Sequence, residues 1–206
     1  TLRLTADDGA TSSSDDVDVT VNQAPVVNPG SALAIALSDP ARLNGSATDD
    51  GFPNPPGAST YNWTVVSGPG AVTFADPTAA STTATFSDAG IYTLRLTAND
   101  SALSGSADLV AMVGGPLPSS WSDQDIGTVG RVGAGSFLTG TFIERGSGAD
   151  IGGSADAFHY IYQPLNGNGT IIARIATQKQ SDPSAKAGVM IRETLDPGSR
   201  QAMAIL

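Results

Sequence analysis

The feature that most constrains the fold of this chain is an internal repeat. The segment TLRLTAND at Thr93–Asp100 copies, with one substitution, the segment TLRLTADD at Thr1–Asp8. The match continues without a gap to Val113 and Val21, and 12 of the 21 paired residues are identical. Repetition at a fixed offset indicates an array of repeated domains. The offset of 92 residues suits one small β-sandwich per repeat better than a solenoid turn.

This offset predicts the domain boundaries. We expect residues 1–21 to be the last hairpin of a preceding module and residues 22–113 to be a whole module. Residues 114–120 form a Pro/Gly linker, and residues 121–206 begin a second domain. The sequence is therefore expected to be a piece of a longer protein.

The first 21 residues predict two strands. Leu2 and Leu4 alternate with polar residues, and three valines alternate along Asp15–Val21, with a long polar turn at Asp7–Ser14. An isolated hairpin is marginal in water. We expect this hairpin to be poorly ordered or to lie against a neighbour.

Composition narrows the class of protein. Of the 20 acidic residues, 18 are Asp, and up to Val113 there are 12 acids against 3 bases. An acidic surface argues against nucleic-acid binding, which requires a basic stripe. No apolar run is long enough to span a membrane. The absence of Cys excludes disulfides and thiolate chemistry.

Residues 22–113 carry the pattern of an immunoglobulin-like Greek-key β-sandwich. About seven short strands alternate inward and outward with turns between them. Trp63 is expected in the core, and Tyr92–Ala98 is expected to bury every second residue. The residues N-x-A-P-V, L-x-G-x-x-x-D-D-G, W-x-V-x-S-G-P-G and D-x-G-x-Y-x-L-x-L-x-A-x-D resemble PKD-like (polycystic kidney disease-type) repeats of secreted bacterial proteins. This resemblance implies a non-catalytic spacer or interaction module.

Acidic turns in this module suggest a calcium site. Asp49 and Asp50 share one turn, and Asn99 and Asp100 share another. If both turns lie at one end of the sandwich, their oxygens converge as Ca²⁺ requires, and the resemblance favours this because some PKD-like domains hold calcium near their ends. The alternative is that Asp and Asn are ordinary turn residues here.

The second domain differs from residues 22–113 in its composition and in its sequence motifs. The segments WSDQDIG, SGADIGGSADAFHYIYQPL, GTIIARI and AKAGVMIRETL resemble the N-terminal half of a concanavalin A-like lectin/glucanase sandwich, a jelly roll truncated at residue 206. Strands are expected around Phe137, at Phe142–Ile143, within Ala157–Pro164 and at Thr170–Thr177, with a hairpin turn at Asn166–Gly169. Two more are expected at Ala187–Ile191 and Gln201–Leu206.

The sequence offers no catalytic constellation. His159 is the one histidine, no G-x-S-x-G motif exists, and the glutamates Glu144 and Glu193 are far apart in sequence. The chain is therefore predicted not to be an enzyme.

Exposed aromatic residues suggest carbohydrate binding, because sugars stack on aromatic rings. The candidates are Trp121, His159, Tyr160 and Tyr162, with core packing as the alternative for the aromatic strand. We predict an extracellular, all-β, non-catalytic binding or display segment of a large secreted or surface protein. Its partners would be a polysaccharide or cell-surface glycan and neighbouring domains. The alternatives are a structural spacer or adhesin stalk, and an accessory region of a glycoside hydrolase.

Overall fold

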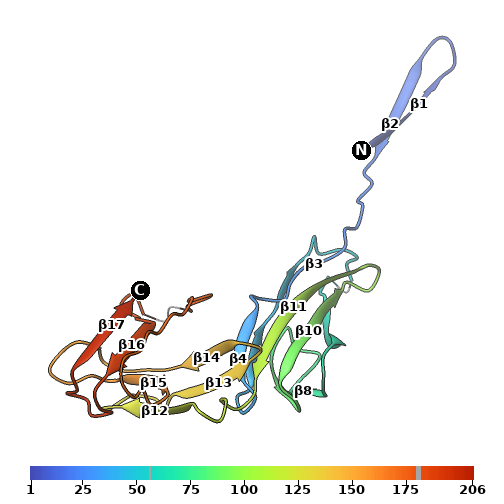
Figure 1. Ribbon diagram of the computed structural model, residues 1–206. Coiled ribbons are helices and arrows are strands. Elements are labelled where there is room, and N and C mark those ends of the chain that lie inside the picture. The colour runs from blue at the N-terminus through green and yellow to red at the C-terminus, as the bar shows by residue number, and fades with distance from the viewer. Residues whose placement is uncertain (56, 180–181) are drawn as a thin grey trace. The chain divides into compact units, whose positions relative to one another are not determined.

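The chain is all-β. The computed structural model describes residues 1–55, 57–179 and 182–206, which contain 17 strands and no helix (Figure 1). Within these ranges there is accordingly no helix of the length and apolarity that a membrane crossing requires. The described residues divide into two compact units. One comprises Thr1–Leu33, Pro40–Thr85 and Ile91–Ala111, and the other Ala34–Asp39, Phe86–Gly90 and Met112–Leu206.

The chain starts with an antiparallel hairpin of β1 (Leu2–Asp7) and β2 (Ser12–Val17). The expected long turn at Asp7–Ser14 is wrong, because Asp7 already pairs with Ser12. The reason is Asp8, whose carboxylate accepts the N–H groups of Ala10 and Thr11 and closes a tight turn. The second strand consequently starts and ends earlier than the alternating valines predict.

The PKD-like module contains three sheets. A four-stranded sheet has the order β4 (Leu33–Ala36), β11 (Ser104–Gly114), β10 (Gly90–Asn99), β7 (Thr60–Ser67). A three-stranded sheet has the order β5 (Ala41–Asn44), β9 (Ser81–Phe86), β8 (Val72–Phe74), and β3 (Val26–Asn28) pairs with β6 (Ser46–Thr48). The roughly seven strands predicted in residues 22–113 are thus present, and the structure adds two short strands, β3 and β6, that the alternation did not predict.

The core of the module follows the predicted alternation. Along β10, Leu94 and Leu96 are fully buried, and Trp63 on β7 is 2% exposed. The Trp63 indole N–H donates to the carbonyl of Ala80 at 3.1 Å, so its polar atom is satisfied inside the core. Gly45 allows this packing, because a Cβ there would lie 2.5 Å from Cδ2 of Leu96.

The second unit contains three antiparallel ribbons. They are β12 (Ser122–Ile126) with β15 (Phe158–Tyr162), β13 (Ala134–Leu138) with β14 (Thr141–Arg145), and β16 (Gly188–Arg192) with β17 (Gln201–Ile205). The strand expected at Thr170–Thr177 is absent, so the turn at Asn166–Gly169 does not make a hairpin. The β-prone residues there have no partner strand, and Ile172 is 90% exposed.

A buried ion pair links the end of β16 to the loop that precedes β15. Arg192 and Asp156 have side chains that are each 2% exposed, and Nη1 lies 3.2 Å from Oδ2. The other guanidinium nitrogens donate to the carbonyls of Thr194 and Asp196, and Oδ1 of Asp156 accepts the N–H of Gly152. A buried charge pair is tolerated when its remaining polar atoms are bonded in this way.

Candidate functional site

An aromatic row along β15 is the best-formed candidate site. Phe158, Tyr160 and Tyr162 alternate along the strand, so they share one face. The ring centroids of Phe158 and Tyr160 are 5.7 Å apart, and those of Tyr160 and Tyr162 are 5.5 Å apart with an interplanar angle of 13°. All three side chains are partly exposed. We call these three residues the β15 row.

Neighbouring groups hold the β15 row in place. The Tyr160 hydroxyl donates to the carbonyl of Met190 at 3.1 Å. Burial raises the pKa of Tyr160, with the Arg192 charge opposing it, so the phenol keeps its proton at neutral pH. The Arg192 guanidinium lies 5.3 Å from the Phe158 ring centroid, within the range of a cation–π contact. The row is therefore anchored at two of its three rings.

Polar residues of β12 lie beside the row. Gln124 pairs with Tyr160, and Ser122 pairs with Tyr162. Directly paired residues of an antiparallel ribbon project to the same face. Stacking rings next to an amide and a hydroxyl are the groups that carbohydrate sites combine.

His159 points to the opposite face of β15. It is 6% exposed; its Nδ1 lies 2.9 Å from Oδ1 of Asp125 and its Nε2 lies 3.2 Å from Oδ2 of Asp123. The same carboxylates accept the N–H groups of Gly133 and Gly135. His159 is therefore a buried residue whose ring nitrogens contact carboxylates of β12, and it is not part of the β15 row.

Trp121 also lies apart from the β15 row. Its ring centroid is 4.6 Å from that of Phe142, which is 5.0 Å from that of Phe137. Trp121 directly precedes β12, and its ring packs against an aromatic ring of β14, not against the β15 row. Of the four predicted ligand residues, the structure brings together Tyr160 and Tyr162.

Three interacting charged or titratable residues, Glu144, His159 and Asp123, could not be predicted to lie close together from their spacing in the sequence. Desolvation raises the pKa of Glu144 on β14 although part of its side chain is exposed; His159 lowers that pKa and Asp123 raises it. These residues come from three strands, and the polar segment Ser122–Ile126 gave no strand signal. What brings β12 to His159 is its pairing with β15, in which Asp125 lies directly opposite His159.

Two of the predicted calcium residues, Asp50 and Asp100, bond to the segment that leads into the module. Asn22 Nδ2 donates to Oδ2 of Asp100 at 3.0 Å, and the backbone N–H of the next residue, Gln23, donates to Oδ2 of Asp50 at 3.0 Å. The two acidic turns are therefore joined by the segment leading into the module. Asp49, which precedes Asp50, is exposed.

The oxygens of these turns already bind backbone groups. Oδ1 of Asp100 accepts the N–H groups of Leu103 and Ala102, and these bonds lower the pKa of a carboxyl that is 1% exposed. Oδ1 of Asn99 likewise accepts the N–H of Ser101 at 2.7 Å. Among the residues that the structure describes, no group of three acidic or histidine side chains is arranged for a metal ion. The geometry favours the turn-residue interpretation, and calcium binding stays a prediction.

Comparison with known proteins finds a family model that matches part of the chain. Residues 29–113 match the family model described as K319L-like, PKD domain. This supports the predicted PKD-like part, and PKD domains are typically non-catalytic. The concanavalin A-like half has no such support.

Three of the similar solved structures each cover about half of the chain. The PKD domain from KIAA 1837 protein is 24% identical, with 51% of this chain and 99% of that chain covered and a TM-score of 0.38. The PKD domain from human KIAA0319 is 19% identical, with 52% and 98% covered and a TM-score of 0.38. Domains 4 and 5 of the S-layer protein SbsC are 13% identical, with 51% and 59% covered and a TM-score of 0.33.

Proposed function

We propose that this chain is a non-catalytic, extracellular binding and display segment that binds carbohydrate through the β15 row. The PKD match at residues 29–113 supports the modular, extracellular part, because PKD domains are typical of extracellular or surface proteins. The stacking of Tyr160 on Tyr162 is the single observation that carries the binding part.

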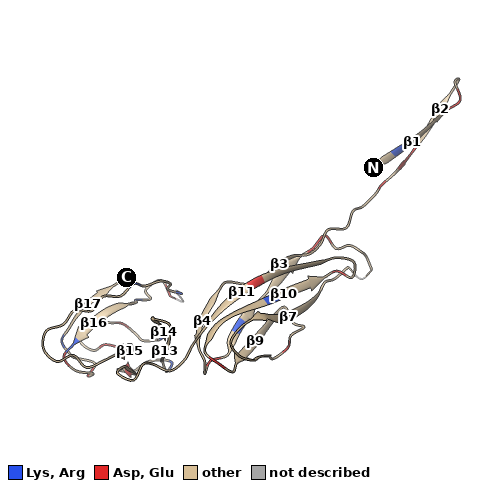
Figure 2. Ribbon diagram, turned by 45° about the vertical axis from the view of Figure 1, so that its right-hand side comes forward, with Lys and Arg blue, Asp and Glu red and all other residues tan. Residues whose placement is uncertain are grey.

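The β15 row suits a sugar because it is both rigid and amphipathic. Tyr160 is fixed by its bond to Met190, so little side-chain entropy is lost when a ligand stacks on the rings. Gln124 and Ser122 offer donors and acceptors for ring hydroxyls on the same face. The strands β12 and β15 contain no Lys or Arg, and Figure 2 shows basic residues on other elements such as β1, which fits a neutral ligand better than a polyanion.

The test is a polysaccharide binding panel with the whole chain, run with calcium and with chelator. We expect saturable binding to one class of glycan, and Tyr162→Ala should weaken it about tenfold, since one ring contact is worth about 1.4 kcal/mol. Trp121→Ala, at a ring that packs on Phe142 and lies outside the β15 row, is the matched control and should bind as the parent does. Failure of every glycan to bind, with the fold intact, would refute the proposal.

The second candidate function is a structural spacer. The repeated hairpin sequence at Thr1–Val21 and Thr93–Val113 favours it, because tandem modules are the usual way to build a stalk. A spacer predicts no binding on the panel and no effect of Tyr162→Ala. An accessory role beside a glycoside hydrolase instead predicts binding to that hydrolase's substrate.

A further inference from the structure

The hairpin β1–β2 reproduces the hairpin β10–β11 in detail. Arg3 donates through Nε and Nη2 to the two carboxylate oxygens of Asp16, at 2.6 and 2.7 Å. Arg95 makes the same two bonds to Asp108, at 2.6 and 2.9 Å. Both pairs bridge 13 residues, so the two hairpins share one register.

The turns of the two hairpins also match. Asp8 accepts the N–H groups of the residues two and three positions later, and Asp100 does the same. In each turn the backbone N–H of the aspartate donates to the carbonyl three residues on, at 3.2 Å for Asp8 and 3.1 Å for Asp100. The hairpin at residues 1–17 therefore has the same cross-strand ion pair and the same turn as the hairpin that closes the complete module.

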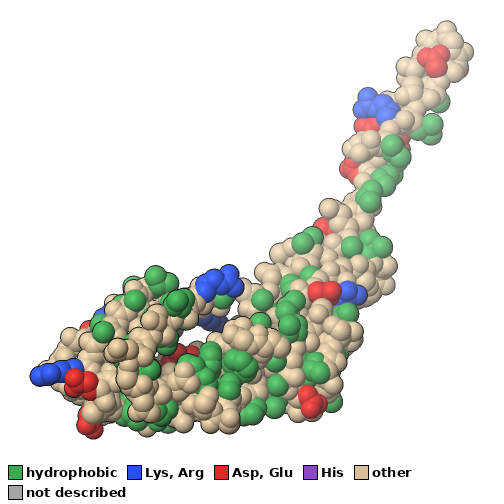
Figure 3. All heavy atoms as spheres, in the orientation of Figure 1, with side chains coloured by type: hydrophobic (Ala, Val, Ile, Leu, Met, Phe, Trp, Pro, Cys, Tyr) green, Lys and Arg blue, Asp and Glu red, His purple; other side chains and the backbone are tan. Residues whose placement is uncertain are grey.

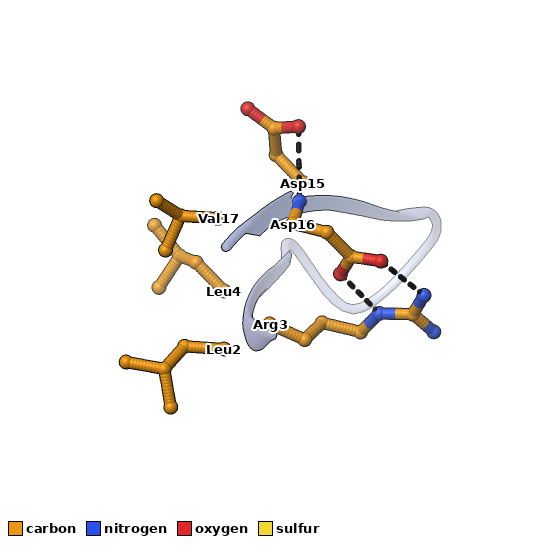
Figure 4. Close-up of a pocket in the computed structure, with 6 residues that line it drawn as sticks. All are labelled: Leu2, Arg3, Leu4, Asp15, Asp16 and Val17. Atoms are coloured by element: carbon orange, nitrogen blue, oxygen red, sulfur yellow. Dashed lines mark hydrogen bonds and ion pairs between the residues drawn. The ribbon is translucent and has the colours of Figure 1, made fainter. Parts of the chain in front are cut away.

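The apolar faces of the two hairpins differ in burial. Leu2, Leu4 and Val17 point to one side of β1–β2, and Arg3 and Asp16 point to the other (Figure 4). The three apolar residues are 62%, 77% and 57% exposed, whereas their counterparts Leu94, Leu96 and Leu109 are 0%, 0% and 2% exposed. Val19 and Val21, which follow the end of β2, are also exposed, at 55% and 75%. Hydrophobic side chains accordingly lie on the surface of this part of the chain (Figure 3).

The module shows what such a face packs against. Leu96 pairs with Trp63 on β7 and lies against Gly45, a close approach that a Cβ would block. Within the sheet, β10 has β7 on its outer edge and β11 has β4 on its outer edge. By contrast, β1 and β2 form a two-stranded sheet of their own in the described part of the chain.

We propose that hairpin β1–β2 docks, as the closing pair of strands, on a partial β-sandwich of the kind formed by residues 22–92. The partner carries a Trp-bearing strand equivalent to β7 that pairs with β1, and a strand equivalent to β4 that pairs with β2. Its core leaves a glycine-lined space for Leu4, as Gly45 does for Leu96. Burying the face removes exposed Leu and Val side chains from water, and it covers two strand edges that otherwise promote non-specific pairing.

The test adds that partner to the whole chain. A second copy of residues 22–92 is fused directly before Thr1, which restores the spacing that joins residues 22–92 to Thr93. Amide hydrogen exchange in β1 and β2 is compared with that of the unfused chain. A reference fusion carries the sequence of Thr93–Val113 in place of Thr1–Val21 and defines the protection of a complete sandwich.

We expect exchange at Leu2 and Leu4 to slow by at least about 100-fold in the fusion, approaching the reference, because opening then requires unfolding of a domain. Leu4→Asn should abolish the protection, whereas Thr5→Asn, on the opposite face of the strand, should keep it. Equal exchange in fused and unfused chains, with the reference protected, would overturn the proposal. Protection that survives Leu4→Asn would also overturn it, because the apolar face would then not be the docking surface.

Discussion

Leu4 and Leu96 hold equivalent places in the two copies of the repeat, yet Leu96 is fully buried and Leu4 is 77% exposed. Each sits in the first strand of an antiparallel hairpin, and each neighbours an arginine that binds an aspartate of the second strand. The difference between them is the covering by the rest of a sandwich. Comparing these two leucines therefore separates the hairpin structure that the repeated sequence forms from the burial that the rest of a sandwich provides.

This pair gives a direct prediction about stability. Leu96→Ala should lower the free energy of unfolding of the PKD-like module by about 2–5 kcal/mol, since it leaves a cavity beside Trp63. Leu4→Ala should change it by less than about 0.5 kcal/mol, because the side chain is already exposed. Denaturant unfolding followed by Trp fluorescence measures both. Equal losses from the two substitutions would contradict the burial difference.

Gly45 provides a second prediction on the same core. A Cβ at residue 45 would lie 2.5 Å from Leu96 Cδ2, 2.6 Å from the carbonyl oxygen of Ala80 and 3.0 Å from Trp63. Gly45→Ala should therefore destabilise the module by about 1–3 kcal/mol through overpacking. Gly130→Ala is the control, because no atom lies within 4 Å of a Cβ there. Thermal unfolding of the two variants should differ clearly, and equal midpoints would show that the core is looser than described.

The turn at Asp100 predicts a dependence of stability on pH. Its bonds to the N–H groups of Leu103 and Ala102 lower the pKa of the Asp100 carboxyl in the folded state. Because the pKa of this carboxyl is lower in the folded state, its ionised form stabilises the fold at pH values above the pKa of an unfolded Asp, about 3.9. This stabilisation is lost as the pH falls through the pKa of the folded state. The parent and Asp100→Asn should thus differ in denaturant midpoint at pH 6 and converge towards pH 2. A difference that is the same at both pH values would rule out the charged carboxylate as its source.

The buried pair of Arg192 and Asp156 should dominate the stability of the second unit. Asp156→Ala leaves a guanidinium buried without its counter-charge, and the expected loss is about 3–5 kcal/mol. The ion pair of Lys186 with Asp150 is the control, because both side chains reach solvent, and Lys186→Ala should have a much smaller effect. Calorimetry of the chain separates the two units if they unfold independently. An unchanged transition in Asp156→Ala would contradict the structural role of the pair.

Alternation predicted most of the fold. Tyr92–Ala98 buries every second residue as expected, and Trp63 lies in the core, because both belong to strands with one face in the sandwich. The segment Thr170–Thr177 has an equally β-prone sequence but forms no strand. Propensity does not create a strand unless a partner strand is present. The sequence did not predict β12, because its residues are polar and do not alternate with apolar ones. It forms a strand because it pairs with β15.

The candidate site was predictable in part. The alternation of Phe158, Tyr160 and Tyr162 put their rings on one face, and the structure agrees. The partners of His159 were not predictable, because Asp125 lies 34 residues earlier and meets it through strand pairing. The packing of Trp121 on Phe142 was not predictable either, because the two residues lie in different segments of the chain.

The most direct test of the central claim, that hairpin β1–β2 displays an uncovered copy of a face buried in β10–β11, is residue-resolved amide hydrogen exchange on the unaltered chain. Amides of Leu94, Leu96 and Leu109 should exchange only through unfolding of the module. Amides of Leu2, Leu4 and Val17 should exchange orders of magnitude faster, because a lone two-stranded hairpin is marginally stable in water. Equal protection of Leu4 and Leu96 would contradict the account, since it would mean that the apolar face of the hairpin is already covered.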